Sequence, residues 1–85
     1  MKRTDVSYGQ LDKVLRSLGF AYRSAKHDPP GHIYEHKEAG AVVMLPAFAK
    51  NDKVFEHHLV AVRTELENFG LADASVFAAK LQKAG

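Results

Sequence analysis

The chain has 85 residues, a formal net charge of +2 and no cysteine. This length predicts one domain, residues 1–85, with one hydrophobic core. The lack of cysteine excludes disulfides, thiolate metal sites and a cysteine nucleophile. No apolar run reaches the roughly 18 residues that a membrane span needs, and the polar start Met1-Lys2-Arg3 is unlike a signal peptide. We therefore expect a cytoplasmic protein with no membrane partner.

Positive charge is concentrated in the first third of the chain. Residues 1–26 carry six Lys or Arg against two Asp or Glu, whereas residues 27–85 carry six against eight. A basic end of this kind suits a surface that faces phosphate groups, although a solvated helix face has the same composition.

The first predicted element is a helix from about Tyr8 to Leu18. Ser7 and Gln10 have the spacing of a capping box, in which each side chain bonds the backbone amide of the other residue. Apolar residues then recur at three- and four-residue spacing, as in an amphipathic helix. Gly19 is placed to end the helix in a left-handed conformation.

Three strands are predicted next. Residues 20–23 alternate in a way that suits a strand, and the prolines of residues 28–31 make a rigid loop. Residues 32–37 form the second strand, residues 37–40 a glycine-containing turn, and the apolar run 41–45 the third strand.

Two helices complete the predicted fold. Asn51 or Asp52 can cap a helix whose apolar stripe ends before Gly70, and Asp73 can cap a short last helix. The predicted order is α-β-β-β-α-α. We therefore expect an α+β fold with a three-stranded antiparallel sheet and helices packed on one of its faces.

The five histidines do not have the spacing of a metal site. His32 and His36 would lie about 13 Å apart on a strand. His57 and His58 are adjacent on a predicted helix, with no His, Asp or Glu three or four residues away. Since Gly-rich phosphate-binding loops are also lacking, we expect neither a metal site nor a cofactor.

Histidine acid-base chemistry remains as a candidate activity. In RNA cleavage the 2′-hydroxyl loses a proton and attacks the neighbouring phosphate, so a histidine and a cation are a sufficient set of groups. Alternation places His32, Tyr34 and His36 on one face of their strand. We expect water to reach this face, where Tyr34 could stack on a base or only cover the sheet.

Four short patterns occur along the chain: the helix end Leu18-Gly19-Phe20, the strand Tyr34-Glu35-His36, the run Val42 to Pro46, and Gly70-Leu71. Together they resemble the HicA family of RNA-cleaving toxins from toxin-antitoxin pairs. The segment with Phe77 and Leu81 would extend beyond the family core. The resemblance implies a fold similar to the double-stranded RNA-binding domain, RNA as substrate, and a HicB-like antitoxin as protein partner.

The resemblance implies a catalytic histidine but leaves two positions open for it. An alignment without a gap places that histidine at Gly31, whereas a one-residue deletion places it at His32, which we take as the candidate catalytic residue. Candidate RNA-binding residues are Arg23, Lys26, Tyr34, His36 and Lys37. The alternative function is a non-catalytic module of the same fold that binds RNA or a protein.

Overall fold

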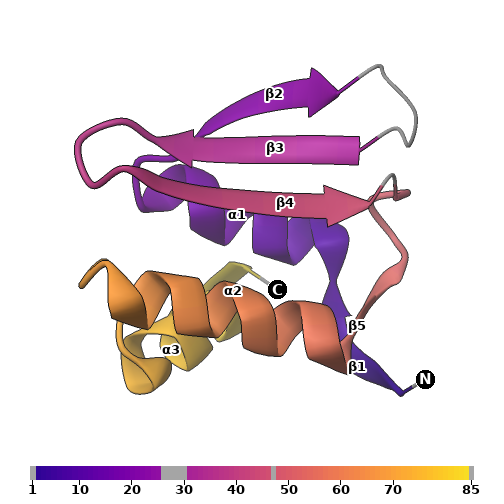
Figure 1. Cartoon of the computed structure of the whole chain (residues 1–85). Helices are drawn as coiled ribbons and strands as arrows, with labels where there is room; N and C mark the ends of the chain where they lie inside the picture. The colour runs from indigo at the N-terminus through magenta and orange to yellow at the C-terminus, as the bar shows by residue number, and fades with distance from the viewer. Residues whose placement is uncertain (1, 26–30, 47, 85) are drawn as a thin grey trace.

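The computed structural model describes residues 2–25, 31–46 and 48–84, with Ala25 described by its backbone alone. A three-stranded sheet forms one layer, and the helices lie together beneath it (Figure 1). A second, two-stranded sheet lies at one end of the molecule. The elements in chain order are β1 (Arg3–Ser7), α1 (Tyr8–Ser17), β2 (Ala21–Ala25), β3 (Gly31–His36), β4 (Ala41–Pro46), β5 (Lys53–Phe55), α2 (Glu56–Asn68) and α3 (Ala74–Ala84).

The predicted ends of α1 are confirmed. The Gln10 amide donates to the Ser7 hydroxyl at 3.1 Å, and the Ser7 amide donates to the Gln10 side chain at 2.9 Å. This reciprocal capping box satisfies two amides that the helix leaves without partners. At the other end Gly19 has a φ of 98°, and the Phe20 amide returns to the Leu15 carbonyl at 3.1 Å.

The main sheet has the strand order β2-β3-β4 and is antiparallel throughout. Tyr34 lies opposite Tyr22 on one side and Val43 on the other. Tyr34 and Val43 are buried against the helices, whereas Val42 and Met44 of β4 are exposed on the other face. The predicted α+β fold, with helices on one face of a three-stranded antiparallel sheet, is confirmed.

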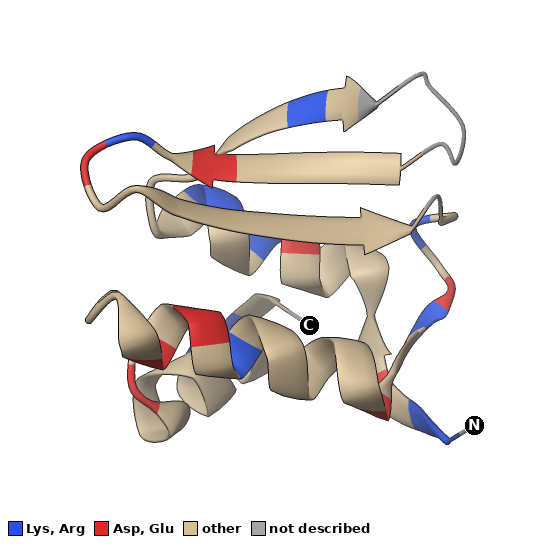
Figure 2. Ribbon diagram, viewed as in Figure 1, with Lys and Arg blue, Asp and Glu red and all other residues tan. Residues whose placement is uncertain are grey.

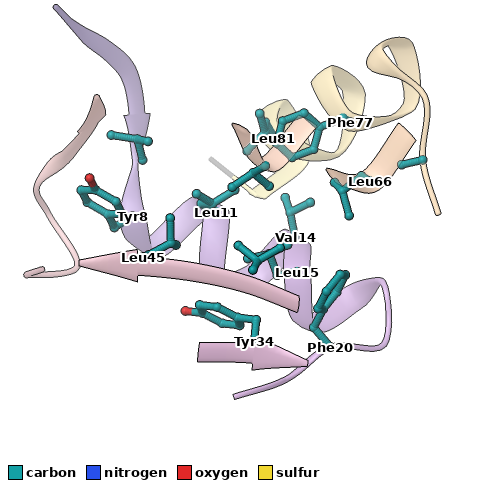
Figure 3. Close-up of a cluster of buried hydrophobic side chains, with 14 of the residues drawn as sticks. Tyr8, Leu11, Val14, Leu15, Phe20, Tyr34, Leu45, Leu66, Phe77 and Leu81 are labelled. Carbon is teal, nitrogen blue, oxygen red and sulfur yellow. The ribbon is translucent and has the colours of Figure 1, made fainter. Parts of the chain in front are cut away.

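The core lies between the sheet and the helices, with α1 at its centre (Figure 3). Leu11 and Leu15 have no exposed surface and Val14 almost none. Around them pack Leu66 of α2, together with side chains of α3 and the inner face of the sheet. The stripe predicted for α1 is therefore its buried face.

The sequence did not predict β1 and β5, and it placed the start of α2 too early. The chain remains extended through Lys53–Phe55 because this segment pairs with β1, so α2 begins at Glu56. The Glu56 amide then donates to the Lys2 carbonyl at 2.9 Å. Asp52, a predicted helix cap, instead accepts from the Ala49 amide within the preceding loop at 3.1 Å.

The last helix begins as predicted. The Asp73 carboxylate accepts from the Val76 amide at 2.8 Å, and Gly70 before it has a φ of 68° that ends α2. In the described part of the chain, no helix has the length and apolarity that crossing a membrane requires.

Candidate functional site around His32

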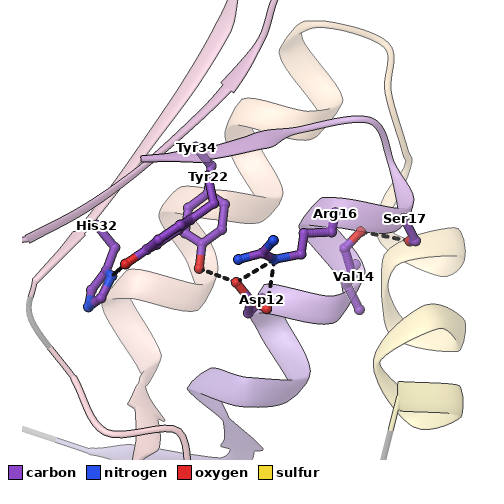
Figure 4. A network of polar contacts seen from close by, with 7 residues as sticks. All are labelled: Asp12, Val14, Arg16, Ser17, Tyr22, His32 and Tyr34. Atoms are coloured by element: carbon purple, nitrogen blue, oxygen red, sulfur yellow. Dashed lines mark hydrogen bonds and ion pairs between the residues drawn. The ribbon is translucent and has the colours of Figure 1, made fainter. Parts of the chain in front are cut away.

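His32 lies on the inner face of β3, where the ring is partly exposed to solvent. The Tyr22 hydroxyl forms a short hydrogen bond with Nδ1 of His32 (Figure 4), and the ring tautomer decides which of them donates. On its other side the imidazole packs on Phe48, with ring centroids 4.1 Å apart. Among the residues that the structure describes, Nε2 of His32 has no hydrogen-bond partner. The ring is thus held through one nitrogen while the other is available to a ligand.

Strand register explains why Tyr22 reaches His32. Ser24 lies directly opposite His32 and Tyr22 lies opposite Tyr34, so Tyr22 and His32 are diagonal neighbours on one face of the β2–β3 pair. Diagonal neighbours are within reach of long aromatic side chains. The two ring centroids are 5.3 Å apart.

A carboxylate and a cation from α1 lie on the far side of Tyr22. Asp12 accepts hydrogen bonds from the Tyr34 hydroxyl at 2.7 Å and from Nε of Arg16 at 3.0 Å (Figure 4). The Arg16 guanidinium carbon lies 5.1 Å from the centroid of the Tyr22 ring, in cation-π geometry. Only Nε of Arg16 contacts Asp12, and about half of the side chain is exposed. Arg16 can therefore offer its terminal nitrogens to an anion next to Tyr22.

Tyr34 does not lie on a water-exposed face. The expectation that this face of β3 is the wet one is wrong, because α1 covers it and Tyr34 has no exposed surface. A ring buried in this way cannot stack on a base. Burial, and then the hydrogen bond to Asp12, raise the pKa of the Tyr34 phenol above its ordinary value. Tyr34 therefore remains a neutral donor that joins the sheet to α1.

The cations nearest to His32 in sequence are not brought to it. Arg23 lies on the opposite face of the sheet, where it forms an ion pair with Glu35 at 2.6 Å. Figure 2 shows these two charges on β2 and β3. Lys26 is outside the described residues. The cation in this network is instead Arg16, which comes from α1.

His36 and Lys37 lie at the other end of β3 from His32. The Ala39 amide donates to Nδ1 of His36 at 3.1 Å, and the His36 ring packs edge-on against Phe20 with centroids 5.3 Å apart. A side chain at Gly19 would come within 3.0 Å of the same ring. His36 thus holds the β3–β4 turn against the end of α1. The exposed Lys37 lies in that turn, and the structure brings neither residue to His32.

Gly31 and His32, the two positions to which the resemblance could assign a catalytic histidine, differ in their surroundings. A Cβ atom at Gly31 would lie only 2.8 Å from the Leu45 carbonyl oxygen, so a side chain there requires the backbone to move. Alternation also places residue 31 on the same face as Ile33 and Glu35. Only His32 faces Tyr22 and α1.

Of the other three histidines, His27 lies outside the described residues, and His57 and His58 lie together on α2. Their ring centroids are 4.1 Å apart, and the Tyr8 hydroxyl lies 3.0 Å from Nδ1 of His58. Burial lowers the pKa of His58, and the neighbouring His57 lowers it further. Across the described ranges, His, Asp and Glu side chains do not gather in groups of three that could hold a metal ion.

Sequence reasoning missed Asp12, Arg16, Tyr22 and Phe48 as members of the site. A partial signal was present, because Asp12 and Arg16 have the four-residue spacing of a helical ion pair. Their proximity to His32 depends on how α1 packs on the sheet, which no local pattern reports.

Comparisons of the chain with models of known protein families, with curated proteins and with solved structures found no match.

Proposed function

We propose that the protein is a HicA-like toxin that cleaves RNA by histidine acid-base chemistry, with His32 as its catalytic residue. One observation carries the proposal, which is the arrangement of the His32 ring. Its Nδ1 is held by Tyr22, its face is held by Phe48, and its Nε2 is left to a ligand. A general base must lie within hydrogen-bonding distance of the proton that it removes, and a ring held in one orientation meets this requirement.

The reaction that fits this site is transesterification. Nε2 of His32 takes the proton of the 2′-hydroxyl, and the 2′-oxygen forms a bond to the adjacent phosphorus. The bond from phosphorus to the 5′-oxygen then breaks, and the leaving oxygen takes a proton from water. The hydroxide that forms removes the proton from Nε2 and so restores the base. The products are a 2′,3′-cyclic phosphate and a 5′-hydroxyl end. Arg16, beside the Tyr22 ring, neutralises the charge of the phosphate. It thus takes the role that was expected for Arg23 and Lys37.

The decisive experiment compares RNA cleavage by the purified wild type and His32→Gln. Glutamine keeps polar bulk at the site but cannot exchange a proton near neutral pH, so we expect a loss of about 10²- to 10⁴-fold in rate. The wild-type rate should persist in excess chelator, because no step of the reaction uses a metal ion. Expression should arrest growth, and His32→Gln should relieve the arrest.

The matched control is His57→Gln, because His57 is an exposed histidine on α2. This variant should cleave RNA and arrest growth as the wild type does. Equal cleavage by wild type and His32→Gln would contradict the proposal, as would a wild type that cleaves no RNA.

A second candidate function, a non-catalytic module that binds a protein partner, is favoured by the exposed apolar surface of β4. Met44 is 72% exposed and Val42 is 43% exposed, on the face that the helices leave open. Beside them the charges of Arg23 and Glu35 are paired with each other. A surface of this kind suits a protein more than a nucleic acid. It is also the place where the HicB-like antitoxin implied by the resemblance would bind.

Met44→Asp tests whether this surface binds a protein partner. A carboxylate at this position should abolish binding of a small protein encoded by a neighbouring gene and leave RNA cleavage unchanged, because it lies on the opposite face from His32. If the wild type binds such a partner but neither cleaves RNA nor arrests growth, the binding module is the function.

A further inference from the structure

We infer that a groove between α1 and α3 binds the phosphate backbone of RNA, as an extension of the site at His32. The groove has a volume of about 260 Å³ and is lined by Lys13 of α1 and by Lys80 and Lys83 of α3, with Val14, Ser17 and Ala84 between them. The inference rests on the proposed function in one respect, because that function makes RNA the ligand.

The three lysines around this groove have no counterion among the residues that the structure describes. In the described part of the chain none of them forms an ion pair, and no carboxylate lines the groove. Helix α3 carries no Asp or Glu at all. The single carboxylate of α1, Asp12, already accepts from Arg16 and Tyr34. Like charges on one surface repel one another weakly through water, so a bound anion would stabilise the cluster.

Helix stability alone does not explain this cluster. A cation in the last turn of a helix interacts favourably with the helix dipole, which accounts for Lys83. Lys80 lies outside the last turn of α3 and Lys13 belongs to α1, so a preference for a cation within that turn accounts for one lysine of the three. Packing of α1 against α3 brings the three side chains to one hollow.

The groove is connected to the proposed cleavage site through α1. Lys13 and Arg16 are three residues apart on α1 and so are neighbours on the helix surface. Arg16 in turn lies over Tyr22, which contacts His32. These cations follow one another along the surface, and among the described residues no aromatic ring lines the groove. Such a row of positive charges fits a ligand with regularly repeated negative charges, as in the phosphate backbone of RNA. Contacts of this type position a nucleic acid without reading its sequence.

The test measures binding of a long single-stranded RNA to the His32→Gln protein, in which cleavage does not interfere. Changing Lys13, Lys80 and Lys83 together to glutamine should weaken binding by on the order of tenfold or more at moderate salt. The slope of a plot of the logarithm of affinity against the logarithm of salt concentration should become smaller in magnitude by about 2, since each lost phosphate contact removes about 0.7 from it. Changing only Lys83 to glutamine should give a smaller loss of the same kind.

The control changes three other lysines, Lys2, Lys50 and Lys53, to glutamine, which gives the same net charge. This control should bind RNA as the parent does. Equal weakening in both triple variants, no RNA binding by the parent, or tighter binding of polyglutamate than of RNA to the groove would each overturn the inference.

Dinucleotide cleavage in an otherwise wild-type background separates the inference from the proposed function. A dinucleotide is too short to reach the groove, so the groove variant should cleave it normally while cleaving long RNA poorly. If the wild type cleaves no RNA but the groove variant still loses affinity for long RNA, the groove stands and the proposed function fails.

Discussion

At the scale of single residues, Asp12 joins α1 to the sheet. Its carboxylate accepts from Tyr34 of β3 and from Arg16 one turn along the helix. Tyr34 buries its whole side chain and still satisfies its hydroxyl. A buried phenol without a partner would be costly, so this hydrogen bond allows an aromatic residue with a polar group to occupy the core.

His58 has a lowered pKa because it is partly buried and lies beside His57. The unfolded chain, with a histidine pKa of about 6.5, takes up a proton before the folded chain does. Neutral His58 therefore contributes stability that is present above about pH 6.5 and is lost as pH falls through its lower folded pKa. We expect the free energy of unfolding to decrease between about pH 7 and pH 5 for this reason.

Chemical denaturation of His58→Gln measures this effect. The variant should lose less stability on acidification than the wild type, since glutamine keeps a polar partner for Tyr8 and does not titrate. His57→Gln removes the second cause of the shift and should give an intermediate result. Identical pH dependence in the wild type and His58→Gln would show that His58 is not responsible.

At the scale of elements, local signals decided where α1 begins and ends. Ser7 and Gln10 satisfy each other's amides, and the amides of Tyr8 and Gly9 donate to carbonyls of the loop at residues 50–52. The helix start is thus held both by its own sequence and by a segment far along the chain.

Ser7→Ala should destabilise the protein by about 1 kcal/mol, because it leaves the Gln10 amide without its side-chain partner. Ser75→Ala is the matched control. Ser75 is an exposed serine in the first turn of α3, and its side chain forms no hydrogen bond among the described residues. Urea denaturation should show a lower midpoint for Ser7→Ala alone. A control that loses as much stability would mean that the capping box is not the cause.

At the scale of the whole molecule, the β1–β5 pair connects two segments about fifty residues apart in sequence. The Thr4 hydroxyl donates to the Val54 carbonyl at 2.9 Å, and Val54 itself is completely buried. The small sheet therefore belongs to the same hydrophobic core as the main sheet.

Val54→Ala should lower the free energy of unfolding by about 2 kcal/mol, from the loss of two buried carbon atoms and the space they leave. Val42→Ala is the control, because Val42 is also a strand valine but lies on the open face of the main sheet. Its effect should be below about 0.5 kcal/mol. The urea transition of Val54→Ala should keep a single step with an unchanged slope. A separate early transition would show that the β1–β5 pair unfolds independently.

Sequence by itself determined the elements whose signals are local: the capped helix α1 with its apolar stripe, the glycine that ends it, and three strands in order. The stripes predicted for α2 and α3 were correct only in part, because Phe55 belongs to β5 and Phe69 and Val76 are exposed. The sequence also placed His32, Tyr34 and His36 on one face of β3. Only the tertiary structure decided that α1 covers this face, that Arg16 and not Arg23 is the cation beside Tyr22, and that residues 53–55 pair with β1. The physical reason is that side-chain alternation and capping depend on neighbours in sequence. Which face is buried, and which segments pair, depends on burial and hydrogen bonding across the whole chain.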